Sequence, residues 1–364
     1  MLETEKLARL RRNLLGWYDQ HRRDLPWRKS RDPYAIWVSE IMLQQTRVAV
    51  VVERYQAFLA RFPTVVSLAL APEQDVLALW SGLGYYRRAR MLHKAAQFVT
   101  EHHEGRLPSS AEALRLLPGI GAYTAAAIAS IAFGEAVAVV DGNVERVLCR
   151  MAGWEAGSRA GGAHQKRRID ELANKLVDVK RPGDFNQALM ELGATVCMPR
   201  NPQCLVCPFC SDCKTRGEHK RPPRAPMLSR EVGYALVVRL SGKASKTHVS
   251  NAREVLLEQR PTTMSVMPGM WELPSLREPA VPENELRMTV RHAIMQVNYY
   301  VRIRTVIEDD VEALTAVGGK RQWVPLAEAG EMALTGLTRK VLTRARLLPN
   351  ARLVAVGEGP EALV

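Results

Sequence analysis

The sequence predicts an all-α region over residues 1–215 and a separate α+β region over residues 231–364. Apolar residues in the first region recur at the three- and four-residue spacing of helices, whereas the second region contains runs of β-branched and aromatic residues typical of strands. Between them, residues 216–230 combine three prolines with a dense basic run, which is typical of a linker. With 364 residues, 47% of them apolar, the chain is long enough for two or three domains with buried cores.

The predicted helices of the first region follow from apolar spacing and are separated by Pro and Gly. The strongest pattern runs from Tyr34 to Phe62 and predicts one continuous helix over 34–62. Further helices are expected over 73–80, 87–101, 110–117, 122–132, 143–151, 165–178 and 184–196. In the second region we expect strands at 232–240, 254–259, 297–306 and 321–325, and helices near 283–290 and 332–346.

The charge distribution favours a polyanionic partner. The chain carries 51 Lys and Arg against 38 Asp and Glu, and +10 of its net +13 lies in residues 1–225 (33 basic minus 23 acidic). Lys and Arg gain affinity for nucleic acids by releasing the counterions condensed on the phosphates. The first 12 residues lack the apolar stretch of a signal peptide, and no window approaches about 18 apolar residues. We therefore expect a cytoplasmic protein with no membrane span.

Five of the six cysteines fall within 17 positions, which favours metal ligation over disulfides in a reducing compartment. Four thiolates suit either zinc or an iron–sulfur centre. One set of four has the spacing C-x6-C-x2-C-x5-C: Cys197, Cys204, Cys207 and Cys213. Cys210 permits a second set, because residues 204, 207, 210 and 213 form C-x2-C-x2-C-x2-C. Spacing alone does not choose between the two sets, and Cys149, within an apolar helical pattern, is expected in the core.

Two turns carry glycines in positions suited to DNA contacts. The first is a Gly-x-Gly turn between predicted helices, where Gly119 and Gly121 let the backbone approach a phosphate and the next helix offers free N–H groups. The second, over 82–90, places Tyr85 and Tyr86 beside three arginines, which favours an aromatic wedge with phosphate contacts. An ordinary helix–helix turn, or core packing of either tyrosine, is the alternative in each case.

Two carboxylates are candidates for chemistry. Glu40 falls on one polar stripe with Gln44 and Arg47, yet apolar neighbours such as Trp37 could raise its pKa as an acid catalyst requires. Asp141 ends an apolar run at the entrance of a predicted helix. A solvated face position for Glu40, and helix capping alone for Asp141, are the alternatives.

The order of the motifs is itself informative. LPWR at 25–28, VSEIMLQQT at 38–46, GLGYY at 82–86, LPGIGAYTA at 117–125, VDGN at 140–143 and FNQALMELGA at 185–194 precede the cysteines. This series resembles the adenine DNA glycosylases of the MutY type, within the helix-hairpin-helix superfamily, over residues 10–215. The resemblance implies a six-helix core over about 29–130 and a cluster subdomain formed by 1–28 and 131–215.

The resemblance also implies the reaction, which is hydrolysis of the N-glycosidic bond of adenine mispaired with 8-oxoguanine or guanine in duplex DNA. Glu40 matches the general acid that protonates adenine N7, and Asp141 matches the carboxylate that stabilises the oxocarbenium-like sugar. Tyr123 and Asn143 match residues beside this catalytic pair. Because related enzymes of the endonuclease III type carry a Schiff-base lysine where Tyr123 stands, the resemblance implies a monofunctional glycosylase.

The resemblance assigns further residues by position. A 4Fe–4S cluster is implied on Cys197, Cys204, Cys207 and Cys213, with Cys210 spare. The implied adenine pocket comprises Arg23, Leu25, Trp27, Arg28, Val48 and Gln187. The implied DNA contacts are Gln45, Thr46, Leu83, Tyr85, Arg87, Gly119 and Gly121. A target base must leave the helical stack before such a pocket can hold it.

The second region resembles the MutT-like (Nudix-like) C-terminal domain of this family through GMWELP at 269–274, His292 and Trp323. It lacks the acidic series of a nucleotide-hydrolysing Nudix enzyme. Where the family has Phe-Ser-His in its lesion-reading loop, this chain has Ile294, Met295 and Gln296, also candidate DNA contacts. We therefore expect a weakened preference for 8-oxoguanine over guanine.

Two alternatives stay open at this point. The first is a helix-hairpin-helix glycosylase for another mismatched or damaged base, and the second is a non-catalytic iron–sulfur module that binds DNA. In all cases the expected partner is duplex DNA, bound by a monomer, with nucleoid association in a bacterial cell.

Overall fold

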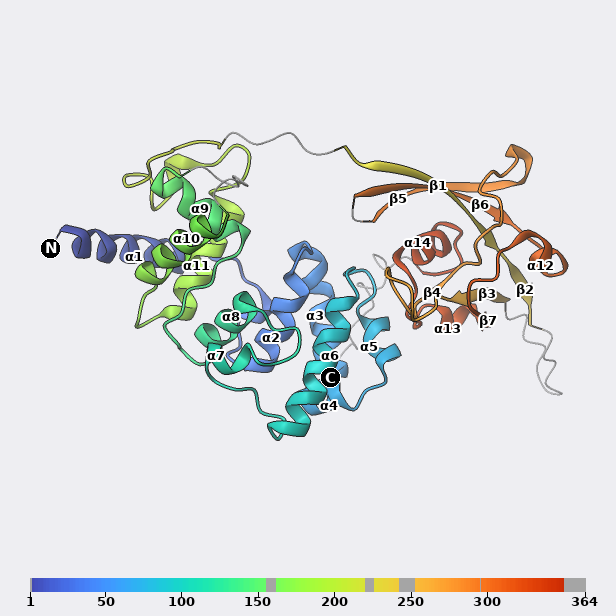
Figure 1. The fold of residues 1–364 in the computed structure, drawn as a ribbon, viewed down its shortest axis with the longest axis horizontal. Helices are drawn as coiled ribbons and strands as arrows, with labels where there is room; N and C mark the ends of the chain where they lie inside the picture. Colours follow the sequence, from blue (N-terminus) through green and yellow to red (C-terminus); the bar gives the residue numbers. More distant parts are fainter. Residues whose placement is uncertain (1, 155–161, 220–225, 242–252, 295, 350–364) are drawn as a thin grey trace, which may run out of the picture. The chain divides into compact units, whose positions relative to one another are not determined.

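The computed structural model describes residues 2–154, 162–219, 226–241, 253–294 and 296–349. Within it the chain divides into two compact units (Figure 1). The first comprises Met1–Ala71 and Arg88–Arg224, and the second comprises Pro72–Arg87 and Ala225–Val364. The domain boundaries expected from the sequence remain predictions. None of the described helices is both long and apolar enough to cross a membrane.

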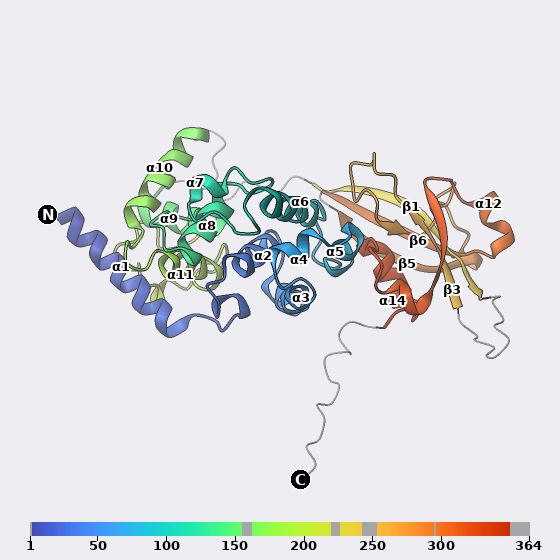
Figure 2. The ribbon, with the colours of Figure 1, turned by 90° about the horizontal axis from the view of Figure 1, so that it is seen from below.

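The first unit is helical, as the sequence predicts (Figures 1 and 2). Most of its helices lie within a few residues of their predicted positions, and the helix predicted over 122–132 has those bounds. The α-helices are α1 (Leu2–His21), α2 (Pro33–Leu43), α3 (Val48–Arg61), α4 (Val65–Ala69), α6 (Arg87–His102), α7 (Ala111–Leu114), α8 (Ala122–Ala132), α9 (Gly142–Ala152), α10 (Gly162–Leu176) and α11 (Pro182–Thr195). The described part of this unit also contains the 3-10 turns η1 (Pro26–Arg28) and η2 (Cys204–Val206).

The single helix predicted over 34–62 is wrong, because the chain breaks between α2 and α3. Gln45 adopts a left-handed conformation with φ of 56°, which a continuing helix does not allow. The guanidinium of Arg88 donates to the carbonyl oxygens of Ile41 (2.6 Å) and Met42 (3.0 Å), which satisfies the exposed end of α2. The apolar period continues across the break, so periodicity alone does not reveal it.

Four helices of this unit share one core, in which α11 packs against both α1 and α9. Its largest fully buried side chains include Leu14, Tyr18, Phe185 and Phe209. α11 also packs against α8, and α8 packs against α2. Because α2, α8, α9 and α11 are neighbours, side chains far apart in the sequence meet between them.

The second unit is α+β, as predicted (Figure 1). In one described sheet β6 (Val297–Thr305) lies between β1 (Leu228–Leu236), which is parallel to it, and β5 (Leu286–Ile294), which is antiparallel. In the other, β3 (Arg253–Gln259) pairs antiparallel with β2 (Val238–Leu240), β4 (Trp271–Glu272) and β7 (Lys320–Pro325). The remaining elements are α5 (Glu73–Leu79), η3 (Glu283–Glu285), η4 (Glu308–Asp310), α12 (Val311–Leu314), α13 (Leu326–Ala329) and α14 (Gly336–Arg344).

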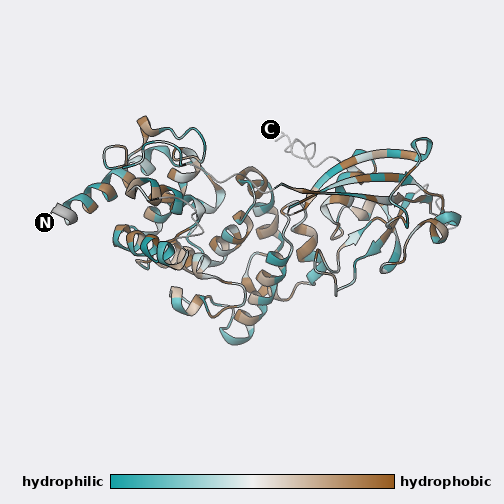
Figure 3. Ribbon diagram, turned by 45° about the horizontal axis from the view of Figure 1, so that its top comes forward, coloured by the Kyte–Doolittle hydropathy of each residue, from teal (hydrophilic) through white to brown (hydrophobic). Residues whose placement is uncertain are grey.

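The core of this unit lies where the strands meet α14. Leu337, Val341 and Leu342 of α14 join Val255, Val301 and other strand residues in one apolar cluster. Brown and teal segments alternate along the strands in Figure 3, as expected when alternate side chains face a core.

One helix prediction and one strand prediction in this unit need correction. The helix predicted near 283–290 is wrong, because only the short turn η3 precedes the strand β5. Met288, Val290, His292 and Ile294 alternate with exposed residues, a period of two that outweighs local helix propensity once β6 is paired. The strand predicted over 232–240 is divided into β1 and β2, and β1 already begins at Leu228, within the predicted linker.

Candidate active site

Glu40 lies on a helix that is buried on all sides. Every residue of α2 from Tyr34 to Met42 is buried, and the side chain of Glu40 is held among them at 5% exposure. The predicted polar stripe is therefore wrong: Gln44 caps the end of α2, and Arg47 lies beyond it. A carboxyl in such surroundings loses the hydration that its ionised form needs.

The Glu40 carboxyl has one hydrogen-bond donor on a neighbouring helix. The hydroxyl of Tyr123, in the first turn of α8, donates to Glu40 Oε2 at 2.6 Å and also lies 3.4 Å from Met190 Sδ of α11. Burial raises the pKa of Glu40 from 4.5 to about 7, although the bond from Tyr123 opposes the rise and Asp141 adds to it. That change corresponds to about 3 kcal/mol in favour of the protonated form. The site therefore supplies a proton donor near neutral pH.

Asp141 forms the N-cap of α9. Its Oδ1 accepts from the backbone N–H groups of Asn143 (2.9 Å) and Val144 (2.7 Å), and its Oδ2 accepts from Asn143 Nδ2 (2.8 Å). Asp141 and Tyr123 line one cavity, and Tyr123 in turn donates to Glu40, so Tyr123 links the two carboxyl groups. Capping and proximity to Glu40 thus coexist at this residue.

Asn143 is itself held by α11 and by the cysteine region. Arg146 Nη2 donates to Asn143 Oδ1 (2.8 Å) and to the carbonyl of Gly193 (2.7 Å), and its Nε donates to the carbonyl of Cys197 (2.9 Å). A Cβ on Gly193 would lie 2.7 Å from Asn143 Cβ, so only glycine allows α11 this close. The orientation of Asp141 is thereby tied to two other elements.

A cavity of about 1080 Å³ opens beside Tyr123 and Asp141. Glu145, one turn along α9 from Asp141, also lines it. α10 lines part of it through Gln165, Lys166 and Asp170, and the α7 region contributes Glu112, Arg115 and Leu116. This volume is large enough to admit a nucleoside.

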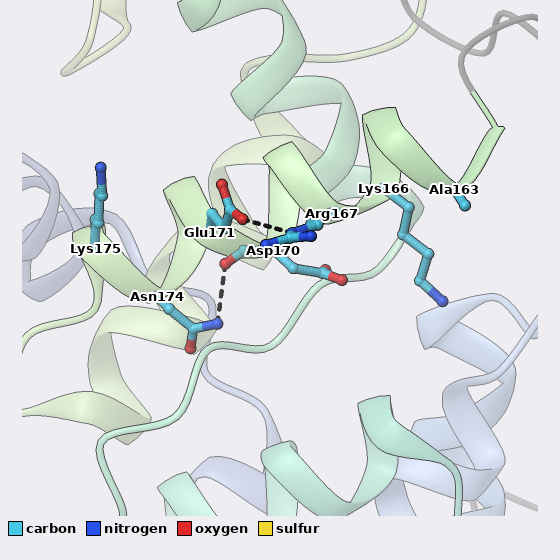
Figure 4. A pocket seen from close by; sticks show the side chains of 7 residues that line it. All are labelled: Ala163, Lys166, Arg167, Asp170, Glu171, Asn174 and Lys175. Carbon is cyan, nitrogen blue, oxygen red and sulfur yellow. Dashed lines mark hydrogen bonds and ion pairs between the residues drawn. The ribbon is translucent and has the colours of Figure 1, made fainter.

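A second, more open hollow of about 590 Å³ lies along α10 (Figure 4). Its side chains come from this one helix, and several engage each other: Arg167 pairs with Glu171 at 2.9 Å, and Asn174 donates to the carbonyl of Asp170. We assign it no part of the site.

Glu191 is a residue of the site region that the sequence reasoning missed. It is buried in α11 at 1% exposure, where Arg23 donates to both of its carboxylate oxygens and Arg28 donates to Oε2 (2.8 Å). Burial raises the pKa of Glu191, but the hydrogen bonds from the two arginines outweigh it, and the pKa falls to about 2. The positive charge of Arg28 also lowers the pKa of Glu40. Arg23 and Arg28, both predicted pocket residues, thus bind the same carboxylate, Glu191. Glu191 lies within the motif at 185–194, but the sequence analysis did not single it out.

The other predicted pocket residues lie nearby in the chain and are mostly covered. Leu25 and Trp27 are buried around η1, and the ring of Trp27 meets Tyr55 edge-on with centroids 5.6 Å apart. Val48 begins α3 and Gln187 lies on α11, both half-buried. The structure brings Glu40 and Tyr123 into contact and places Tyr123 and Asp141 on one cavity; the placement of the other residues against a base stays a prediction.

The predicted DNA-contact residues occupy turns. Gly119, with φ of 74°, has Met91 Cβ where its own Cβ would reach (2.7 Å), and Gly121 caps α8 without a side chain. In the first unit Gln45 and Thr46 form the break between α2 and α3. In the second unit Tyr85 has φ of 49° and is half exposed, whereas Leu83 and Tyr86 are buried; Arg87 is exposed.

The lesion-loop residues fall at the turn between β5 and β6. Ile294 ends β5 and is half-buried, and Gln296 is exposed. Met295 lies outside the described residues.

Five thiols line one small cavity, of about 30 Å³, in the segment 197–213. Burial raises the pKa of Cys204, and the neighbouring thiols of Cys213, Cys197 and Cys210 raise it further. Arg150 is buried at 2% exposure beside them, with Nη1 3.4 Å from Cys197 Sγ. In the part of the chain that the structure describes, no three Cys, His, Asp or Glu side chains converge on one metal ion. Cys149 is buried, as predicted.

Comparison with known proteins shows which family has this sequence and fold. Residues 38–177 match the family described as HhH-GPD superfamily base excision DNA repair protein. The structure superposes on a thermostable thymine-DNA glycosylase with a TM-score of 0.54 and 32% sequence identity, covering 59% of this chain and 99% of that one. The chain belongs to the HhH-GPD superfamily. An endonuclease III bound to DNA (21% identical, TM-score 0.50, 59% of this chain and 98% of that one) shares the fold.

Two members of this superfamily are similar over more of the chain. The adenine DNA glycosylase of Rattus norvegicus is 42% identical over 312 residues, covering 73% of this chain and 60% of the rat protein. The human adenine DNA glycosylase is 40% identical over 323 residues, covering 75% of this chain and 58% of that protein. The chain thus spans about three fifths of the length of these curated relatives.

The buried carboxyl of this HhH-GPD protein makes stability depend on pH. Because the pKa of Glu40 is about 7 in the folded protein and near 4.5 when unfolded, its contribution to stability is fully present below pH 4.5 and is lost as pH rises through 7. Glu40→Gln cannot undergo this loss. Relative to wild type, we expect the variant to gain about 3 kcal/mol of unfolding free energy between about pH 4.5 and pH 8.

Urea denaturation of both proteins at the two pH values, followed by tryptophan fluorescence, measures this gain. Glu101→Gln on α6, with a side chain 70% exposed, is the matched control and should show no such gain. A stability difference between Glu40→Gln and wild type that is independent of pH contradicts the prediction.

Proposed function

We propose that this protein is a monofunctional adenine DNA glycosylase of base excision repair. Its substrate is adenine opposite 8-oxoguanine or guanine in duplex DNA, and its reaction is hydrolysis of the N-glycosidic bond. The observation that carries the proposal is the buried Glu40 carboxyl, with its pKa near 7, in one site with the capped carboxylate of Asp141. The relatives named adenine DNA glycosylase, similar over three quarters of the chain, support the choice of base.

Glu40 supplies the proton that the departing base needs. Protonation of the purine at N7 turns a poor leaving group into a neutral one, which is general acid catalysis. The hydroxyl of Tyr123 fixes the direction of the carboxyl, and burial together with the adjacent Glu40 raises the pKa of Tyr123 well above its usual range. Tyr123 therefore remains a hydrogen-bond donor throughout.

Asp141 faces the sugar from which the base departs. An oxocarbenium-like sugar carries positive charge, which a fixed carboxylate stabilises. Three N–H donors orient the Asp141 carboxylate before the reaction begins, so no reorganisation is needed as charge develops. Water then adds to the sugar. Because Tyr123 provides no amine at the position of the lyase lysine, no Schiff base forms there, and the product is an abasic site.

Binding to duplex DNA rests on the turns and on the basic charge of the first unit. The Gly119–Gly121 turn presents backbone N–H groups at the start of α8, which suit a phosphate. The base must rotate out of the stack to reach Glu40, and the half-exposed Tyr85 suits the role of a wedge that fills the gap.

The cysteine segment fits a 4Fe–4S cluster held by Cys197, Cys204, Cys207 and Cys213, since their thiols surround one cavity. When bound, the cluster supplies covalent cross-links that fix the segment 197–213. Arg150 and Arg146 then join this segment to α9, at whose N-terminus Asp141 lies.

Base release from defined duplexes tests the proposal. With wild type in excess over duplexes carrying adenine opposite 8-oxoguanine or guanine, we expect alkali-labile abasic sites, at a rate that falls as pH rises above about 7, because Glu40 must be protonated. Glu40→Gln should lose about 10²–10⁴-fold in this rate and keep DNA affinity. Asp141→Asn should also lose rate while the helix stays capped, because Asn is an equally good N-cap.

The exposed Glu101→Gln is the control and should react like wild type. Faster release of thymine opposite guanine would instead favour the substrate of the thymine-DNA glycosylase that shares the fold. DNA binding without release of any base would leave a non-catalytic module.

We further propose that discrimination between 8-oxoguanine and guanine is weak. Where the family has Phe-Ser-His, this chain has Ile294, Met295 and Gln296. It therefore lacks the serine hydroxyl and the histidine imidazole that would contact the lesion. A lost hydrogen bond costs about 1 kcal/mol or more, which is roughly fivefold in affinity.

Single-turnover rates and affinities on the two mispairs measure this discrimination. Restoring the triplet by Ile294→Phe, Met295→Ser and Gln296→His should increase the preference for 8-oxoguanine. The idea fails if the wild type already discriminates as strongly as the restored variant.

A further inference from the structure

The cysteine cavity contains one thiol more than the proposed cluster uses. Cys210 lines the same cavity of about 30 Å³ as the four proposed ligands. A negative charge on Cys210 raises the pKa of Cys204, which lies on the other side of Cys207 in the sequence. A 4Fe–4S cluster takes one protein thiolate per iron, so the fifth thiol has no iron of its own.

The backbone holds Cys210 directly between two proposed ligands. Its N–H donates to the carbonyl of Cys207 (3.0 Å), and its own carbonyl accepts from the N–H of Cys213 (3.4 Å) and from Arg216 Nε (3.0 Å). These bonds form one continuous turn over 207–213, in which Cys210 and Cys213 lie one turn apart. Both thiols line the same cavity.

We propose that Cys210 is a reserve ligand that takes the place of Cys213 when Cys213 cannot bind iron. The proposal rests on the proposed 4Fe–4S cluster and deepens it. In the exchange, the Cys210 thiol loses its proton to water and its sulfur forms the Fe–S bond that the Cys213 sulfur no longer makes. A displaced Cys213 thiolate takes up a proton. No electron is transferred, so the exchange needs no oxidant or reductant.

The proposal also explains the evenly spaced C-x2-C-x2-C-x2-C pattern, in which Cys210 is the reserve ligand. With Cys213 absent, Cys197, Cys204, Cys207 and Cys210 still provide four thiols around the cavity. With Cys210 also absent, only three remain. Three thiolates leave one iron without a protein ligand, and we expect a cluster held at only three irons to be lost during purification.

Iron and acid-labile sulfide per polypeptide, together with the visible absorbance of the full-length protein purified without oxygen, test the proposal. Alanine replaces cysteine, because a serine oxygen could itself bind iron. We expect Cys210→Ala to keep the wild-type content and Cys213→Ala to keep at least about half of it. The double variant Cys210→Ala, Cys213→Ala should retain less than about one tenth.

The matched control is the double variant Cys149→Ala, Cys213→Ala, which removes a buried thiol outside the cavity and should behave like Cys213→Ala alone. Circular dichroism of each variant shows whether the helical unit is folded. For a variant that is poorly folded when purified, anaerobic reconstitution with iron and sulfide gives the same comparison.

Two results overturn the proposal. If Cys213→Ala is as poor in iron as the double variant, Cys210 does not substitute. If Cys210→Ala alone loses the cluster, Cys210 is an ordinary ligand and the set is 204, 207, 210 and 213. A wild-type protein without iron or sulfide would instead refute the proposed cofactor, which separates the two failures.

Discussion

The site depends on the cost of burying one carboxyl group. Within the described residues Glu40 accepts one side-chain hydrogen bond, from Tyr123, and it lies on a helix that is buried from Tyr34 to Met42. Losing water costs an ionised carboxylate far more than one hydrogen bond returns, and the protonated form therefore prevails up to about neutral pH. A stronger donor set would abolish this property. The two arginines on Glu191 show the contrast, because they bring the pKa of that carboxyl, which also has little exposure, down to about 2.

The fold protects this arrangement by keeping positive charge on other partners. Arg23 and Arg28 are bound by Glu191, and Arg146 is bound by Asn143 and by carbonyl groups of α11 and Cys197. The guanidinium of Arg88 satisfies the carbonyl groups at the end of α2. Glu40 thus accepts from a phenol hydroxyl, while Arg28, whose charge lowers the pKa of Glu40, is bound by Glu191. The proposed division of two carboxyl groups into one proton donor and one oriented anion rests on these partners of Glu40 and on the N–H groups that bind Asp141.

The sequence predicts well what depends on local pattern. α8 and the capping role of Asp141 follow from the Gly-x-Gly turn and from the step from an apolar run into a helix. Prediction from the sequence fails where a contact with a residue far away in the chain determines the structure. The break after Gln44 depends on Arg88, the strand β5 depends on pairing with β6, and the burial of Glu40 depends on α8 and the other helices around α2. Glu191 lay in a recognised motif, yet its arginine partners lie more than 160 positions away, so no spacing could reveal them.

The protonation state of Glu40 in the folded protein tests this account most directly. Carbon-13 NMR of protein labelled at the glutamate side-chain carboxyl carbon, compared with Glu40→Gln to assign the resonance, follows this one group as pH changes. The account predicts a midpoint near 7 for Glu40. A midpoint near the ordinary glutamate value of about 4.3 would mean that the group is ionised at neutral pH and cannot be the proton donor.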